Sequence, residues 1–408
     1  MSLCINSERL REDIEALALF GRDPKGGISR PSFSKADLEA RGWLKDKIQG
    51  AGLILRQDGA GNIFGRIDGP GKTVMAGSHI DTVLNGGKFD GSIGVLAALE
   101  CLRRIKEERI ALTRPLEMAS FTDEEGNLAG DFLGSRAFMG LLNKEEILHG
   151  RTAFGPKLEE ILKGTEFSIE SVFEARRQRP EVEAYLELHI EQGAVLETEE
   201  IPIGIVESIA GKHYRSCSFL GKASHAGTTP LELRRDAFLG LADFALKSTR
   251  YVATEHYGSV VTIGKANLSP GAFSIVPARA DFSFEFRSES KETLRELEKN
   301  LFALADEVAS TRGLGFVSRL IDRTDPVQIP ERITDILKKG CEELGYPWMP
   351  VMSGAGHDAQ ILAGACDAGM IFIPCGDGIS HAPEESINGE DLEKGANLLL
   401  QAILKLAA

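Results

Sequence analysis

The stretch from Gly77 to Gly94, GSHIDTVLNGGKFDGSIG, carries side chains that could bind a divalent metal ion. His79 and Asp81 stand one residue apart after a short apolar run, and Asp90 follows nine residues past Asp81, just before a helical pattern of apolar residues. Imidazole together with carboxylate favours zinc, manganese or cobalt over calcium or magnesium. Taken alone, the stretch would also suit a glycine-rich turn with a helix-capping aspartate.

Three further apolar, strand-like runs end in residues of the same kinds. Asp123, Glu124 and Glu125 follow the run PLEMASFT, His189 follows AYLEL, and His381 comes a few residues after IFIP. Each has a simpler explanation by itself, because charge runs are usually solvated and a lone histidine at a strand end is more often structural. Together they supply enough nitrogen and oxygen donors for two metal ions that share a bridging carboxylate.

These side chains need a scaffold that brings strand ends together. Strand-like and helical patterns alternate through the first part of the chain, with a helix expected over about 92–106 directly after Asp90. This alternation predicts an α/β fold with a mixed, largely parallel sheet. Ligand sites in such sheets lie beyond the carboxyl ends of the strands, which is where the candidate ligands fall.

The middle of the chain has a different pattern. The order strand, helix, strand, strand, helix, strand is typical of a ferredoxin-like (βαββαβ) unit. The expected elements cover 216–220, 235–249, 259–266, 281–287, 291–310 and 315–320. We therefore expect a metal-binding catalytic domain made of residues 1–209 and 322–408, with residues 210–321 inserted as a second domain.

Composition limits the classes of partner and compartment. The 408 residues carry a net charge of −14, which argues against nucleic acid or an anionic membrane as the partner. No apolar run has the length of a transmembrane helix. The six cysteines form no CxxC pair, a pattern that indicates reduced thiols and a cytoplasmic location.

Eight motifs occur along the chain in the order of a known family, between about residues 77 and 385. They are GSHIDT, GGKFDG, TDEEG, LELHIEQG, GKASHAGTTP, RRDA, SGAGHDA and SHAPEE. With them the chain resembles the M20 metallopeptidase/amidohydrolase superfamily. It is most similar to the branch of N-carbamoyl-L-amino acid hydrolases, allantoate amidohydrolases and β-ureidopropionases. The resemblance implies a di-metal catalytic domain, an inserted dimerisation or lid domain, and a homodimer.

The resemblance also implies a ligand set for two divalent ions, manganese or zinc, with cobalt or nickel as further options. Asp90 would bridge the two ions. His79 and His189 would complete one site, and Glu125 and His381 the other.

Catalytic roles follow from the same resemblance. Asp81 would orient the His79 ring, and Glu124 would act as the general base that takes a proton from the attacking water. His225 would donate a hydrogen bond to the developing oxyanion across a dimer interface.

Substrate contacts are implied as well. Arg287 matches the arginine that grips the substrate carboxylate, a geometry that lysine cannot reproduce. Gln192, Gly356 and His357 match other substrate-facing positions, and Ser274 stands where the branch usually has an asparagine. That replacement leaves the identity of the substrate open.

The predicted reaction is hydrolysis of the carbamoyl (ureido) C–N bond of an N-carbamoyl-L-amino acid or a related ureido acid such as allantoate. The products would be an amino acid, carbon dioxide and ammonia. One alternative is an M20 aminoacylase or dipeptidase that cleaves an ordinary amide bond. Another is a non-catalytic binding homologue, which is disfavoured because no metal ligand or general base is missing from the sequence.

Overall fold

A computed structural model describes residues 3–408, except for the side chains of residues 177 and 178. The chain forms two compact units. Unit 1 contains the chain up to Glu207 together with Ile329–Val351 and His357–Ala408, and unit 2 contains Ser208–Gln328 and Met352–Gly356. The domain boundaries expected from the sequence, at 210 and 321, lie close to these limits and stay a prediction.

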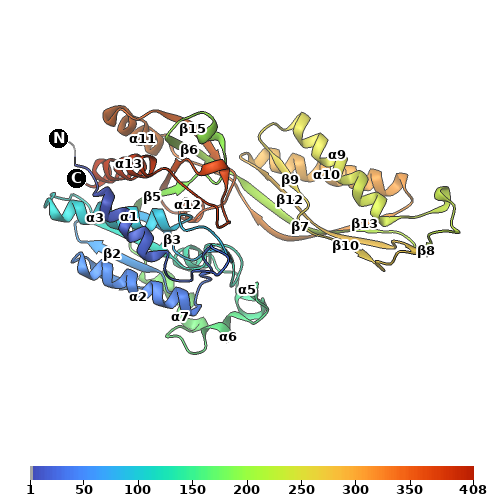
Figure 1. Ribbon diagram of the computed structural model, residues 1–408, viewed down its shortest axis with the longest axis horizontal. Coiled ribbons are helices and arrows are strands. Elements are labelled where there is room, and N and C mark those ends of the chain that lie inside the picture. Colours follow the sequence, from blue (N-terminus) through green and yellow to red (C-terminus); the bar gives the residue numbers. More distant parts are fainter. Residues whose placement is uncertain (1–2) are drawn as a thin grey trace. The chain divides into compact units, whose positions relative to one another are not determined.

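Unit 1 is built on a mixed sheet (Figure 1). Its strands are β1 (Ile54–Gln57), β2 (Ile63–Ile67), β3 (Thr73–His79), β4 (Leu116–Phe121), β5 (Val182–Ile190), β6 (Ile203–Ile209), β15 (Trp348–Ser353) and β16 (Asp367–Ile373). Neighbouring strands follow the order β1-β2-β4-β3-β5-β16-β6. The four central strands, β4, β3, β5 and β16, are parallel to one another, and the flanking pairs are antiparallel. The predicted α/β class with a largely parallel sheet is confirmed.

Helices cover both faces of this sheet. The helices of the unit are α1 (Ser7–Leu17), α2 (Lys35–Gly50), α3 (Ser92–Glu107), α4 (Leu133–Met139), α5 (Lys144–His149), α6 (Leu158–Leu162), α7 (Ile169–Glu174), α8 (Val195–Thr198), α11 (Glu331–Leu344), α12 (Asp358–Leu362) and α13 (Gly389–Ala407). Adjacent residues of a strand point to opposite faces. In β5, Leu188 lies against Gly395 of α13, and Glu187 accepts a hydrogen bond from the main chain of Ala359 in α12. Because both faces are covered, β3 and β4 are buried along their whole length.

Unit 2 is an antiparallel sheet with two helices on one face (Figure 1). Its elements are β7 (Gly211–Leu220), β8 (Ser224–His225), α9 (Ala237–Glu255), β9 (Val260–Thr262), β10 (Ala266–Ser269), β11 (Ile275–Val276), β12 (Arg279–Ser288), α10 (Lys291–Thr311), β13 (Gly315–Thr324) and β14 (Val327–Gln328). The sheet has the order β10-β12-β7-β13, with β9 beside β12, whereas β8 and β11 form a separate ribbon and β14 pairs with the end of β6. The expected βαββαβ order is present, but the strand expected over 259–266 is divided into β9 and β10.

Buried and more exposed side chains alternate along β12, and this alternation determines which of them lie on the open face of the unit 2 sheet. Phe282, Phe284 and Phe286 are buried in the core formed with α9 and α10, whereas the residues between them lie on the open face of the sheet. Full burial of a phenylalanine contributes about 1.5–3 kcal/mol, so this register is strongly favoured over a slip by one residue. Arg287 consequently belongs to the open face.

Candidate metal centre

The predicted metal ligands come together at the carboxyl ends of the parallel strands of unit 1. His79 is the last residue of β3, His189 is near the end of β5, and Asp90 directly precedes the α3 region. Donor atoms of these three residues lie within 4.8 Å of one another. A second group with the same spacing consists of Asp90, Glu125 and His381.

Asp90 belongs to both groups through different oxygen atoms. Its Oδ1 lies 3.2 Å from Nε2 of His189 and 3.6 Å from Nε2 of His79. Its Oδ2 lies 3.1 Å from Nε2 of His381, and that nitrogen is 3.5 Å from Oε2 of Glu125. One carboxylate with each oxygen facing a separate donor set has the arrangement that a bridging ligand requires.

The two buried histidines are oriented by main-chain carbonyls. Nδ1 of His79 lies 3.0 Å from the carbonyl oxygen of Asp81, and Nδ1 of His189 lies 2.9 Å from that of Ile190. A carbonyl only accepts, so each Nδ1 carries the proton and each Nε2 presents a lone pair to the centre. The N–H of Gly91 also donates to Nε2 of His189, which requires that this nitrogen is unprotonated.

The residues at the centre fit divalent metal ions. Nε2 of His79 and Oε1 of Glu125 are buried and have no hydrogen-bond partner among the residues that the structure describes. Leaving such atoms without a partner is costly, and a cation bound at each donor group would remove the cost. Imidazole and carboxylate donors suit zinc, manganese, cobalt or nickel.

Asp81 acts on the neighbouring acidic turn rather than mainly on the histidine ring. Its two carboxylate oxygens accept hydrogen bonds from the main-chain N–H groups of Glu124 and Glu125, at 3.3 and 3.4 Å. Its carboxylate is 3.7 Å from Nδ1 of His79, farther than its own carbonyl. Asp81 therefore orients the Glu124–Glu125 turn, while its main chain orients His79.

Burial and mutual repulsion raise the proton affinity of the acidic turn. Burial raises the pKa of Glu124 well above its usual value, and the carboxylates of Glu125 and Asp358 raise it further. Burial and the nearby Asp90 raise the pKa of Glu125 to about 7. The hydrogen bond to Asp90 raises the pKa of His381 to about 9. Glu124 is only 8% exposed, which accounts for the direction of its pKa shift.

Left-handed backbone conformations gather around this centre. Asp123, Gln192 and His381 each have a φ of 57°, and Gly91 has a φ of 61°. Non-glycine residues adopt such values at a cost of about 1–3 kcal/mol, and they cluster at functional sites. Asp123 keeps its conformation through hydrogen bonds from the N–H groups of Asn127 and Leu128 to its carboxylate.

Gln192 contacts the carboxylate that the two donor groups share. Its side-chain amide donates to Oδ2 of Asp90 at 2.8 Å and lies 3.4 Å from Nε2 of His381. His357 packs edge-on against the His189 ring, with 4.6 Å between the ring centroids. Both residues thus touch predicted metal ligands, and their own predicted contact with substrate stays a prediction.

The remaining predicted site residues lie in unit 2. His225 in β8 pairs with Ile275 in β11, and the Ala226 N–H donates to the Ser274 carbonyl at 2.8 Å, so His225 and Ser274 share one small ribbon. Arg287 donates to the Glu285 carboxylate, to the Gly354 carbonyl at 2.7 Å and to the Tyr214 hydroxyl at 3.3 Å. Gly356 ends the short segment that joins this unit.

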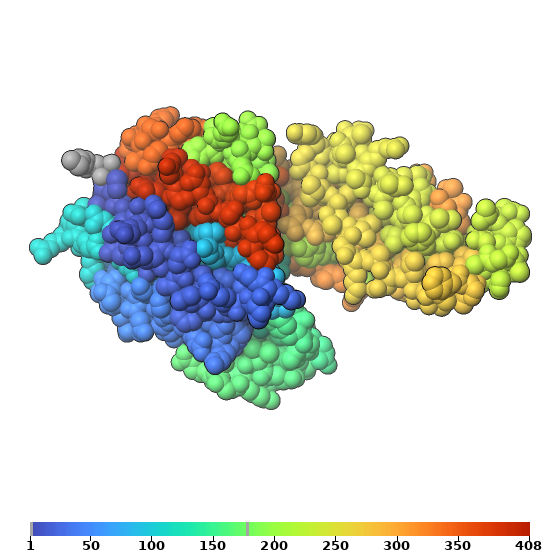
Figure 2. Space-filling model, in the orientation of Figure 1, coloured from blue at the N-terminus to red at the C-terminus, as the bar shows by residue number. Residues whose placement is uncertain are grey.

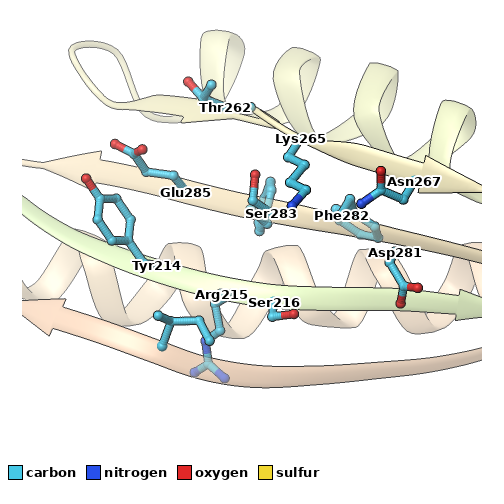
Figure 3. Close-up of a pocket in the computed structure, with 13 residues that line it drawn as sticks. Tyr214, Arg215, Ser216, Thr262, Lys265, Asn267, Asp281, Phe282, Ser283 and Glu285 are labelled. Carbon is cyan, nitrogen blue, oxygen red and sulfur yellow. The ribbon is translucent and has the colours of Figure 1, made fainter. Parts of the chain in front are cut away.

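A groove with a cavity volume of about 450 Å³ crosses the open face of the unit 2 sheet (Figure 3). Tyr214 from β7, Asn267 from β10, and Asp281 and Glu285 from β12 line it. Among the described residues that form its walls, none is a predicted metal ligand or the predicted base. Two of the residues that line it, Tyr214 and Glu285, accept hydrogen bonds from Arg287.

Sequence reasoning missed several residues around the centre. Ser380 and Glu385 hydrogen-bond with Asp90, and Glu187 and Asp358 are fully buried acids close to the ligands. Ser380 and Glu385 belong to the motif SHAPEE, which the sequence analysis identified. No spacing rule, however, indicates which of its two glutamates turns inward.

Nitrogen and oxygen donors at the strand ends of a largely parallel sheet define the kind of site that divalent-metal hydrolases use. Comparison with known proteins shows which family the chain belongs to. The chain belongs to the peptidase family M20/M25/M40, whose model matches residues 75–405. The predicted resemblance to this superfamily is confirmed.

Three relatives illustrate how far the similarity extends. The N-carbamoyl-L-amino acid amidohydrolase of Geobacillus stearothermophilus is 36% identical over 409 residues, which cover 99% of each chain. The allantoate amidohydrolase of Escherichia coli K12 is 34% identical over 408 residues and 98% of each chain. A crystal structure of an amidase of the hydantoinase/carbamoylase family from Burkholderia multivorans has a TM-score of 0.90 at 32% identity, covering 99% of this chain and 98% of that one.

Proposed function

We propose that the protein is a metal-dependent amidohydrolase that cleaves the carbamoyl C–N bond of an N-carbamoyl-L-amino acid or a related ureido acid, releasing amino acid, carbon dioxide and ammonia. The observation that carries the proposal is Asp90, whose two oxygens face two separate donor sets. Full-length relatives named N-carbamoyl-L-amino acid amidohydrolase and allantoate amidohydrolase support the choice of bond.

The proposal requires two divalent ions, manganese or zinc. His79, His189 and Asp90 would hold one ion, and Asp90, Glu125 and His381 the other. The ions would supply Lewis-acid charge and make a water molecule nucleophilic near neutral pH. Their ligands differ in exposure, because the His79 and His189 side chains are 1% exposed and that of His381 is 48% exposed.

Glu124 is the proposed general base. Its Oε2 lies 3.6 Å from Nε2 of His79, so the carboxylate borders the ligand cluster without belonging to either donor group. It would accept the proton of the attacking water and deliver it to the departing nitrogen. Arg287 would bind the substrate carboxylate, with Gln192, Ser274, Gly356 and His357 as further contacts.

We also propose a homodimer in which His225 of one subunit completes the site of the other. Large apolar side chains are exposed on unit 2, whose residues run from green to orange in Figure 2. They include Leu231, Leu233, Phe238, Leu246 and Phe273. Exposure of large apolar side chains on this unit supports an interface here. Mixing inactive Glu124→Gln and His225→Ala subunits should restore activity if His225 acts in trans, and no restoration would remove that role.

Two observations concern the compartment. None of the six cysteines is joined in a disulfide, and four of them are buried. No helix within the described residues combines the length and apolar character needed to cross a bilayer. Free thiols are typical of a reducing compartment, which supports the proposal that the protein works in the cytoplasm.

Ammonia release from a panel of N-carbamoyl-L-amino acids, allantoate and N-carbamoyl-β-alanine tests the proposed reaction. Metal-stripped protein should be inactive and should regain activity with added manganese or zinc. A preference for one ureido acid would identify the substrate. Inactivity across the panel, with cleavage of N-acyl amino acids or dipeptides instead, would replace the proposal by an aminoacylase or dipeptidase.

A further inference from the structure

Glu385 is a buried carboxylate next to the bridging ligand, and neither the predicted ligand set nor the proposed mechanism uses it. The residue is 6% exposed. Its Oε1 accepts hydrogen bonds from the main-chain N–H groups of Phe89, at 2.8 Å, and Asp90, at 3.2 Å. A further buried negative charge beside other carboxylates costs free energy. Its presence at this position therefore suggests that Glu385 has a function in the site.

Ser380 links Glu385 to the coordinating end of Asp90. The serine Oγ lies 3.0 Å from Oδ2 of Asp90 and 3.1 Å from Oε2 of Glu385. A hydroxyl group has one proton to donate, so two carboxylates share one donor. Oδ2 also accepts from the Gln192 amide, and it is the oxygen that faces His381.

Gly87 provides the space that Glu385 occupies. A Cβ atom at this position would lie 2.0 Å from Oε1 and 2.1 Å from Cδ of Glu385. Gly87 does not have a positive φ, so its backbone conformation does not require glycine. The close approach of the carboxylate is therefore what excludes a side chain here.

We propose that Glu385 is a positioning residue: by holding the main chain of Asp90 and, through Ser380, its Oδ2, it sets the affinity of the ion bound between Asp90, Glu125 and His381. The inference rests on the proposed two-ion function. The main-chain contacts act on Asp90 as a whole, but the Ser380 contact acts only on Oδ2, whereas Oδ1 faces His79 and His189. The larger effect is therefore expected at the ion between Asp90, Glu125 and His381.

The test compares metal binding by wild type, Glu385→Gln and Glu384→Gln. Glu384 is the adjacent glutamate and is exposed, so its variant is a control with the same change of charge. Metal-stripped proteins are titrated with Zn²⁺ or Mn²⁺ against a chromogenic chelator that resolves two binding steps. Loss of a group that orients a ligand typically weakens metal affinity by about 10–100-fold. The binding step at Asp90, Glu125 and His381 is called the second step, and the step at His79, His189 and Asp90 the first. We expect Glu385→Gln to weaken the second step by that factor and to leave the first within about twofold, and we expect Glu384→Gln to change neither.

Gly87→Ala is an independent perturbation that displaces Glu385 without altering it. It should weaken the second step as Glu385→Gln does, and it should have little further effect in a Glu385→Gly background, where the overlapping side-chain atoms, Cβ included, are gone. Ser380→Ala should give a smaller loss at the same step.

Melting temperatures of the metal-free proteins separate positioning from general damage. Equal melting temperatures with a selective loss of the second step support the inference. If Glu385→Gln binds two ions with unchanged dissociation constants, or if both steps weaken equally, the inference about Glu385 is wrong. The proposed two-ion function would still stand. A wild-type protein that binds a single ion would overturn both the two-ion function and the inference.

Discussion

Replacement of Gly91 by alanine should damage the metal centre through its main chain. Gly91 precedes α3 and has φ 61° and ψ −44°, a combination outside the regions open to other residues. A Cβ atom there would lie 2.3 Å from Nε2, 2.4 Å from Cδ2 and 2.5 Å from Cε1 of His79. Since carbon contacts are normally about 3.5 Å or longer, the ring would have to move by about 1 Å.

The two consequences have different magnitudes. Backbone strain at this position should lower the free energy of unfolding by about 1–3 kcal/mol. A shift of about 1 Å is large against a zinc–nitrogen bond of about 2.0–2.1 Å, so His79 would cease to coordinate. Loss of a residue that only orients a ligand typically weakens metal affinity by about 10–100-fold. Loss of the ligand itself should cost more, so we expect at least about a 100-fold weaker metal affinity at the site formed by His79 and His189.

Metal titration and urea denaturation of the metal-free protein would measure both effects. Gly42→Ala is a matched control, because Gly42 lies within α2, is exposed, and offers open space to a Cβ atom, which would meet nothing within 4 Å beyond its own helix. Alanine there should stabilise the protein by about 0.5–1 kcal/mol and leave metal binding unchanged. Wild-type metal affinity in Gly91→Ala would refute the assignment of His79 as a ligand constrained by this loop.

Three other predictions concern individual side chains. Glu124→Gln should retain both ions and lose ammonia release by at least about 10²-fold, whereas Glu125→Gln should lose an ion; the opposite pattern in metal analysis would exchange their roles. Arg287→Ala should raise KM for carboxylate-bearing substrates with little change in kcat, and an unchanged KM would remove it from the site. Burial raises the pKa of Asp358 from 3.8 to about 8, so the folded state favours its protonated form. The free energy of unfolding of metal-free protein should therefore fall as pH rises from 4 to 8, by up to about 1.4 kcal/mol per unit, and Asp358→Asn should flatten that slope in urea denaturation at several pH values. Equal slopes in the two proteins would contradict this.

The convergence of the ligands could be predicted because it depends on local patterns and one rule of sheet architecture. His79 and His189 follow recognisable strands, and Asp90 precedes a recognisable helix. Parallel strands place their carboxyl ends at the same edge, so ligands distant in sequence are expected to meet. The assignment of two ions also needs the family resemblance, since strand ends alone do not say which oxygen of Asp90 faces which histidine.

The supporting contacts could not be predicted, because they join residues far apart in sequence through side-chain packing. Glu385 meets Asp90 across 295 positions, and Asp81 meets Glu124 across 43. The division of the strand expected over 259–266 had a local signal in Gly264, since glycine in a strand interior often marks an interruption. The inward turn of Glu385 had none.

The ligand loops are held mainly by buried charged side chains that bind the main chain. Arg30 donates to the carbonyl oxygen of Ile80, between His79 and Asp81, at 2.6 Å. Asp81 accepts from the N–H groups of the Glu124–Glu125 turn, and Glu385 accepts from those of Phe89 and Asp90. Each anchor fixes a backbone segment and leaves the coordinating atoms available. The donor geometry is thus set before an ion binds, so the binding energy of the metal need not be spent on ordering its ligands.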